Sequence, residues 1–207
     1  MAYRDVQEGK FLAAQGAEQI RLMKEAYKFY VKNDFRDALA FGAISLINRY
    51  LKVAKLPKEE DAMFAGAIYL VSRNPFSFAN HTSKQEFAEQ IGVKPASLEW
   101  YAENIAEKLG FIKIKDYRQF PYYIDPEGVI NAVITSVVRQ TVEELMVRTI
   151  LGVEIFNEVE AIDAIVDRLV DRLKIVPSVF KPEIRRIVSE YMSKEIKKYL
   201  QNTEVSK

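Results

Sequence analysis

The stretch TSKQEFAEQIGVKPASLEWYAENIAEKLG, residues 82–110, decides the fold of this chain. A short helix is predicted over 84–91, because two capping residues precede it and each is followed three residues later by Gln or Glu. Gly92 can adopt the left-handed turn that ends this helix, and Pro95 suits the first turn of a longer helix that runs to Leu109. The stretch is therefore predicted to form a helix-turn-helix.

The apolar residues of this stretch have the spacing that such a helix pair requires. Ala88 lies four residues before Gly92, and its small side chain allows the second helix to cross closely. The positions expected to hold the two helices together are Phe87, Ile91, Val93, Leu98 and Tyr101.

A β-hairpin is predicted directly after the helix pair, over 111–125. Ile112 and Ile114 alternate with Lys113 and Lys115, which is the period of two expected of a strand. The following DYRQFP can form a turn, and YYI can return as the second strand. In this position the hairpin would be the wing of a winged helix.

Helices are predicted on both sides of these elements. Three helices are predicted before the helix-turn-helix: one over 17–32, a second that ends near residue 54, and a third from 57 to 73. The third is rich in small residues, and we expect it to be a buried central helix. Those after it cover 129–151, 154–175 and 182–201. The predicted fold class is therefore mainly α: a five-helix domain over 17–125 that contains the helix-turn-helix and its hairpin wing, and a three-helix C-terminal domain over 126–207.

The composition excludes several kinds of function. Lys and Arg total 30 against 29 Asp and Glu, so any basic surface must be local. The chain has no Cys and a single histidine, His81, which excludes thiolate metal sites and sites built from several histidines. We expect no metal, no cofactor and no enzyme activity. No apolar run approaches the length of a membrane span, and we expect a cytoplasmic protein without a membrane partner.

The first domain resembles a cyclin-box repeat of the archaeal and eukaryotic general transcription factor B. The resemblance covers about residues 17–110, and the matching pieces are Ala65–Arg73, Thr82–Ala88, Gly92-Val93 and Leu98–Gly110. That family also carries a cysteine-rich zinc ribbon and a second repeat, and this chain shows neither. The resemblance implies a cyclin-like scaffold used in transcription, and a generic winged helix-turn-helix is the alternative.

Binding of double-stranded DNA is the leading functional hypothesis. The second helix of the pair carries three acidic residues, Glu99, Glu103 and Glu107, and the phosphates of DNA would repel their negative charges. We therefore do not expect this helix to recognise base edges in the major groove. Contacts to the DNA backbone are expected instead from Lys84, Lys94, Ser97, Lys113, Lys115 and Arg118. A homodimer formed by the C-terminal helices would present two such modules to the duplex.

The rival hypothesis is a protein-interaction adaptor that never touches DNA. Trp100 is the only tryptophan, and it falls on the outward face of its helix. Either the C-terminal helices cover this residue, or it anchors a protein partner, such as a component of the transcription machinery.

Overall fold

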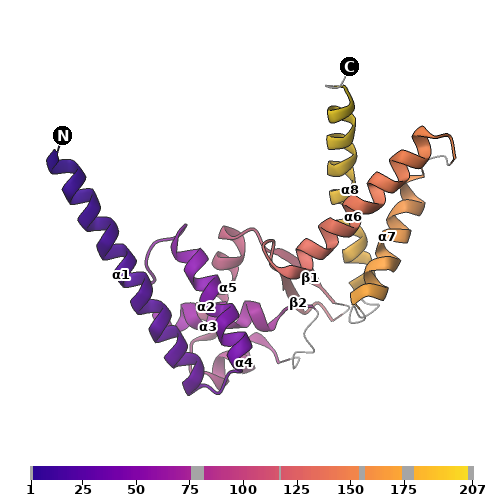
Figure 1. Cartoon of the computed structure of the whole chain (residues 1–207). Coiled ribbons are helices and arrows are strands. Elements are labelled where there is room, and N and C mark those ends of the chain that lie inside the picture. Colours follow the sequence, from indigo (N-terminus) through magenta and orange to yellow (C-terminus); the bar gives the residue numbers. More distant parts are fainter. Residues whose placement is uncertain (1, 76–81, 117, 154–156, 174–179, 205–207) are drawn as a thin grey trace. The chain divides into compact units, whose positions relative to one another are not determined.

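The computed structural model describes residues 2–75, 82–116, 118–153, 157–173 and 180–204. They form two compact units, the first ending at Phe111 and the second beginning at Ile112 (Figure 1). The first unit contains α1 (Ala2–Lys32), α2 (Asp37–Leu51), α3 (Glu60–Ser72), α4 (Lys84–Gln90) and α5 (Pro95–Lys108). The second contains β1 (Ile112–Lys115), β2 (Pro121–Ile124), α6 (Val129–Ile150), α7 (Glu158–Leu173) and α8 (Lys181–Glu204). The predicted class, mainly helical with one antiparallel hairpin, is confirmed for the described residues.

Helix α3 is the central helix of the first unit, as its small residues predict. Every residue from Ala62 to Leu70 is buried. Its closest neighbour is α5, which crosses it at Gly66: a Cβ atom there would lie 2.9 Å from the backbone nitrogen of Ala102 and 3.0 Å from Cβ of Tyr101. Glycine at this position therefore lets the two helix backbones approach each other.

Aromatic rings join the other helices to α3. Tyr30 of α1 is fully buried, and its hydroxyl donates a 2.9 Å hydrogen bond to the carbonyl oxygen of Phe64. Phe87 of α4 packs edge-on against Tyr69 with ring centroids 5.3 Å apart, and it also contacts Phe35 at 6.0 Å. A helix as short as α4 has little stability alone, and Phe87 anchors it to the core.

The turn between α4 and α5 has the predicted geometry. Ser83 caps α4 and forms a reciprocal capping box with Glu86, and the hydrogen bonds from Ser83 hold the pKa of that carboxyl below its ordinary value. Gly92 has φ +70°, and the N–H of Val93 donates to the carbonyl of Ala88 at 3.0 Å. Of the two predicted capping boxes, the structure shows the one that begins at Ser83. The helix-turn-helix prediction is confirmed.

The second unit is built on apolar seams between its three helices. Each helix places buried residues at steps of three and four, which is the spacing of a bundle interface. The seam residues are Ile134, Val137, Val138 and Val142 on α6, Ile162, Ile165, Val166 and Leu169 on α7, and Ile184, Ile187, Val188 and Met192 on α8. The β-branched start of α6 is helical, in agreement with the helix predicted over 129–151.

The hairpin belongs to the second unit. Ile112 pairs with Ile124 and Lys115 with Pro121, so the strands are in antiparallel register. Ile114 is buried, and Tyr122 packs edge-on against Phe180 at 4.8 Å. The unit boundary therefore follows Phe111, whereas the sequence pattern predicts a domain boundary after residue 125.

Two helices differ in extent from their predictions. Helix α1 begins at Ala2, well before the expected residue 17, and no proline interrupts the chain between these two positions. The helix predicted over 154–175 is described only as α7 (Glu158–Leu173), and the remainder of that prediction falls largely outside the described residues.

The close crossing at Gly66 gives a test of the fold. We expect Gly66→Ala to lower the free energy of unfolding by about 1–3 kcal/mol, because the added methyl group meets the α5 backbone. Gly16→Ala in α1 is the matched control: nothing lies within 4 Å of its Cβ position, so a gain of about 0.5–1 kcal/mol is expected. Urea unfolding followed by circular dichroism measures both, and equal effects would contradict the crossing.

Candidate functional site

The six residues predicted to contact DNA divide between the two units. Lys84, Lys94 and Ser97 lie in the first unit, at the starts of α4 and α5. Lys113 and Lys115 lie on β1 of the second unit, and Arg118 follows in the hairpin turn. Each group is therefore described within its own unit.

The cations of the first unit have acidic neighbours. Lys84 forms an ion pair with Glu99 of α5, so its charge is largely balanced within the protein. Lys94 is exposed and lines a small hollow together with three consecutive acids, Glu59, Glu60 and Asp61. This surface carries acidic as well as basic side chains, so its attraction for DNA phosphates is weak.

The hairpin cations lie together on one short element. Lys113 and Lys115 are exposed because they alternate with Ile114, whose side chain is buried. The ammonium group of Lys113 lies 5.6 Å from the ring centroid of Tyr123, its partner in the strand register. Arg118 is exposed in the turn, which Asp116 stabilises by accepting hydrogen bonds from the backbone N–H groups of Arg118 and Phe120.

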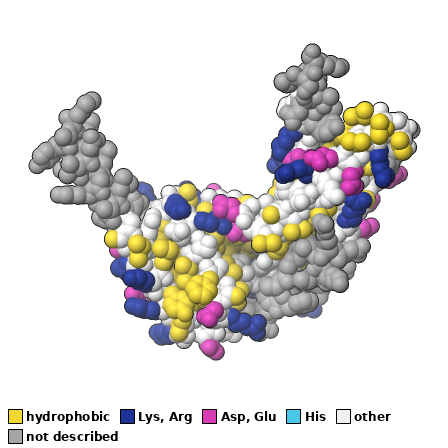
Figure 2. All heavy atoms as spheres, in the orientation of Figure 1, with side chains coloured by type: hydrophobic (Ala, Val, Ile, Leu, Met, Phe, Trp, Pro, Cys, Tyr) yellow, Lys and Arg dark blue, Asp and Glu magenta, His cyan; other side chains and the backbone are white. Residues whose placement is uncertain are grey.

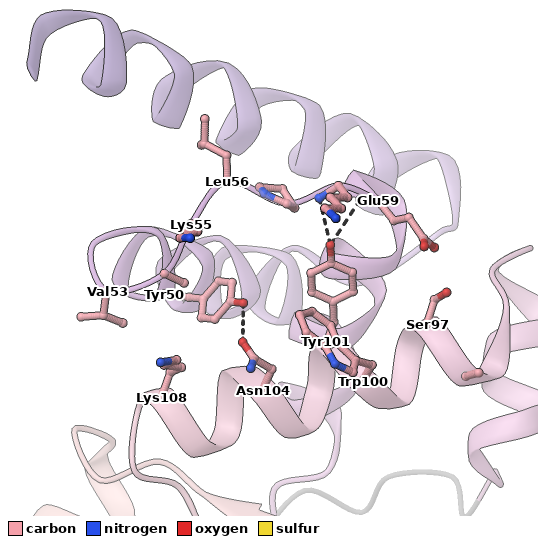
Figure 3. A pocket seen from close by; sticks show the side chains of 14 residues that line it. Tyr50, Val53, Lys55, Leu56, Glu59, Ser97, Trp100, Tyr101, Asn104 and Lys108 are labelled. Atoms are coloured by element: carbon pink, nitrogen blue, oxygen red, sulfur yellow. Dashed lines mark hydrogen bonds between the residues drawn. The ribbon is translucent and has the colours of Figure 1, made fainter. Parts of the chain in front are cut away.

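A hollow of about 750 Å³ lies on the outer side of α5 (Figure 3). One wall is formed by Tyr50 near the end of α2 and by the segment from Val53 to Glu59, and the other by α5. We call this hollow the Trp100 groove. The residues of α5 that line it are Ala96, Ser97, Trp100, Tyr101, Asn104 and Lys108, which share one face at steps of three and four.

Hydrogen bonds hold the two walls of the groove together. The hydroxyl of Tyr101 accepts from the backbone N–H groups of Lys58 at 3.1 Å and Glu59 at 3.2 Å. The hydroxyl of Tyr50 donates to Oδ1 of Asn104 at 2.6 Å. The pKa of Tyr50 is raised, mainly by burial and further by the neighbouring Tyr101. Figure 3 shows both tyrosines between α5 and the opposite wall.

The groove exposes apolar surface. Trp100 is 58% exposed, and its indole contacts the ring of Tyr101 edge-on at 4.8 Å. Val53 and Leu56 on the opposite wall are 55% and 51% exposed. A concave surface with several exposed apolar side chains is typical of a binding site rather than of ordinary protein surface.

Two further apolar surfaces are visible in Figure 2. One covers α1 and α2, where Tyr27 stacks on Phe41 with ring centroids 5.9 Å apart. The other covers the end of α6 and the start of α7, where Ile150, Leu151 and Val159 are exposed. The larger hollow and the tryptophan are both found at the groove, which makes it the best candidate site among the described residues.

The groove is lined by Trp100, which the sequence predicts as a partner contact, and by Ser97, which it predicts as a DNA contact, but the opposite wall is not predicted. Val53, Leu56 and Pro57 fall among lysines in the short connection between α2 and α3, and apolar residues in a charged connection are the signal that could have identified it. The roles of Tyr50 and Tyr101 depend on tertiary contacts, which the helical pattern does not specify.

The described residues contain no cluster of acids, histidines or cysteines able to hold a metal ion, and His81 lies outside them. Within the same residues, no helix combines the length and apolar character needed to cross a membrane. Comparisons of the chain with protein-family models, with curated proteins and with solved structures found no match.

The hydroxyl of Tyr101 gives a test of how the groove is held. We expect Tyr101→Phe to lower the free energy of unfolding by about 1–2 kcal/mol, because the N–H groups of Lys58 and Glu59 lose their acceptor. Tyr27→Phe is the control, since this exposed ring on α1 contributes stacking that phenylalanine retains. If urea unfolding shows the same stability for both variants, the two hydrogen bonds do not hold the wall.

Proposed function

We propose that the protein is a non-catalytic interaction adaptor whose first unit binds a short segment of another protein in the Trp100 groove. The observation that carries the proposal is the half-exposed tryptophan within a hollow of about 750 Å³. Tryptophan is strongly enriched among the residues that dominate binding energy at protein interfaces, because it buries a large rigid surface at low entropic cost.

The dimensions of the groove limit the size of the ligand. The α5 residues that line it run from Ala96 to Lys108, a distance of roughly 18 Å along a helix with a rise of about 1.5 Å per residue. This length accommodates about five residues of extended chain or about twelve residues of helix. A short linear segment therefore matches the groove better than a folded domain surface.

The groove is also preorganised. Hydrogen bonds of Tyr50 and Tyr101 within the chain itself hold its two walls together, so binding need not order them. A cyclin-like scaffold, which the sequence resemblance implies, also suits an adaptor that binds a segment in a helix groove.

Selection from a displayed library of random twelve-residue peptides tests the proposal. We expect the intact protein to yield peptides that bind with micromolar Kd. Trp100→Ala should weaken them about tenfold or more, the range of a dominant interface residue. The matched control is Phe41→Ala, which removes an equally exposed aromatic ring, 60% exposed on α2 and outside the groove.

Two measurements show whether Trp100 forms part of the peptide-binding surface. Fluorescence anisotropy of the labelled peptides gives Kd, and circular dichroism checks that both variants are folded. Selected peptides that bind equally well to Trp100→Ala and to wild type would place the binding surface elsewhere and refute the proposal.

A second candidate function, transcription-related binding of duplex DNA, is supported by the hairpin. Lys113, Lys115 and Arg118 are exposed together on one short element of the second unit. Such a group suits the phosphate backbone, which carries the sequence-independent part of DNA affinity. Two modules in a homodimer would raise this affinity.

Salt titration with a random duplex tests this second candidate. We expect Lys113→Glu with Lys115→Glu to abolish binding at about 50 mM salt, because each lost phosphate contact removes about 0.9 from the slope of log K against log salt. Lys194→Glu with Lys197→Glu on α8 reverses the same charge in the same unit and serves as control. An equal loss in both double variants would indicate a general charge effect, and DNA binding by the hairpin would then be rejected.

A further inference from the structure

We infer that the ligand of the Trp100 groove is an acidic segment, with a bulky apolar side chain on Trp100 and carboxylates at the end of the groove formed by Lys55 and Lys108. This inference rests on the proposed function and names the chemistry of the partner. Four charged side chains line the groove, and three of them are the lysines Lys55, Lys58 and Lys108.

The three lysines are available to a ligand. All are exposed, and no carboxylate among the described residues forms an ion pair with any of them. None of the acidic residues of α5 lines the groove. Glu99 forms an ion pair with Lys84. The pKa of Tyr69 is raised mainly by burial, and the charges of Glu103 and Glu99 also raise it. The groove therefore has an excess of positive charge although the chain as a whole is nearly neutral.

The charge is unevenly distributed along the groove. Figure 3 shows Lys55 and Lys108 at the same end as Val53, with Glu59 and Ser97 toward the opposite end. Glu59 is next to Lys58, so the charges largely offset each other there. Carboxylates of a ligand are thus favoured at the Lys55 and Lys108 end, and an uncharged or apolar part is favoured over Trp100.

Polar groups on α5 suit a polypeptide backbone. Oδ1 of Asn104 accepts the hydroxyl hydrogen of Tyr50, which leaves the amide Nδ2 of Asn104, a residue that lines the groove, as a donor. A peptide carbonyl can accept from it. A peptide is also favoured over single-stranded nucleic acid, because Val53, Leu56 and Pro57 present aliphatic surface where stacked bases would need further aromatic rings.

The test repeats the peptide selection on two double variants. Lys55→Glu with Lys108→Glu reverses the charge of the groove end. Lys24→Glu with Lys32→Glu makes the same change on exposed positions of α1, outside the groove. Peptides selected on wild type are then measured by anisotropy against all three proteins at 50 and 300 mM NaCl, and an oligothymidylate of twenty nucleotides is included as competitor.

We expect peptides selected on wild type to carry a net negative charge beside an aromatic or aliphatic anchor. The groove double variant should weaken them about three- to tenfold, the size of two exposed ion pairs, and should itself select neutral or basic peptides. The α1 double variant should change Kd by less than about twofold, apart from the general weakening that 300 mM NaCl causes.

The remaining outcomes distinguish the acidic character of the ligand from the proposed function of the groove as a binding site. Neutral or basic peptides that still require Trp100 would overturn the acidic ligand and leave the groove as a binding site. If no selected peptide depends on Trp100, both the inference and the proposed function fail. Displacement of every peptide by the oligothymidylate, with loss of oligonucleotide binding in Trp100→Ala, would make nucleic acid the ligand and overturn the inference.

Discussion

The contact on which the first unit depends is the close crossing of α3 and α5 at Gly66. A Cβ atom there would lie 2.9 Å from the backbone nitrogen of Ala102, so the close approach of the two helices depends on glycine at this position. The crossing fixes which face of α5 is buried. Leu98, Ala102 and Ile105 enter the core, and Trp100, Asn104 and Lys108 are consequently held on the outside. The groove is thus a consequence of how two helices pack.

Much of the fold could be predicted from local signals. Ser83, Gly92 and Pro95 determine the backbone conformation within a few residues of themselves. Their positions therefore predict the ends of α4 and α5 to within about two residues. The domain boundary was harder, because it depends on whether Tyr122 packs against Phe180, more than fifty residues later in the chain. No spacing rule for a hairpin specifies that contact.

The candidate site was less predictable than the fold, because charge in a sequence does not reveal pairing. Lys84 and Glu99 lie on different helices, yet they form an ion pair that removes Lys84 from the set of available cations. Lys55 and Lys108 are far apart in the sequence and lie at the same end of one groove. Net charge, which is +1, carries no information about either arrangement.

Stability alone does not account for tryptophan at position 100. More than half of its side chain is exposed, and its ring contact within the unit is with the adjacent Tyr101. A polar residue with good helix propensity would give α5 equal or better intrinsic stability there, and it would expose less apolar surface. The same reasoning applies to Val53 and Leu56 across the groove, which are also about half exposed. Three apolar side chains that contribute little to the core converge on one hollow, and the ligand proposed for this groove would supply the burial that folding does not.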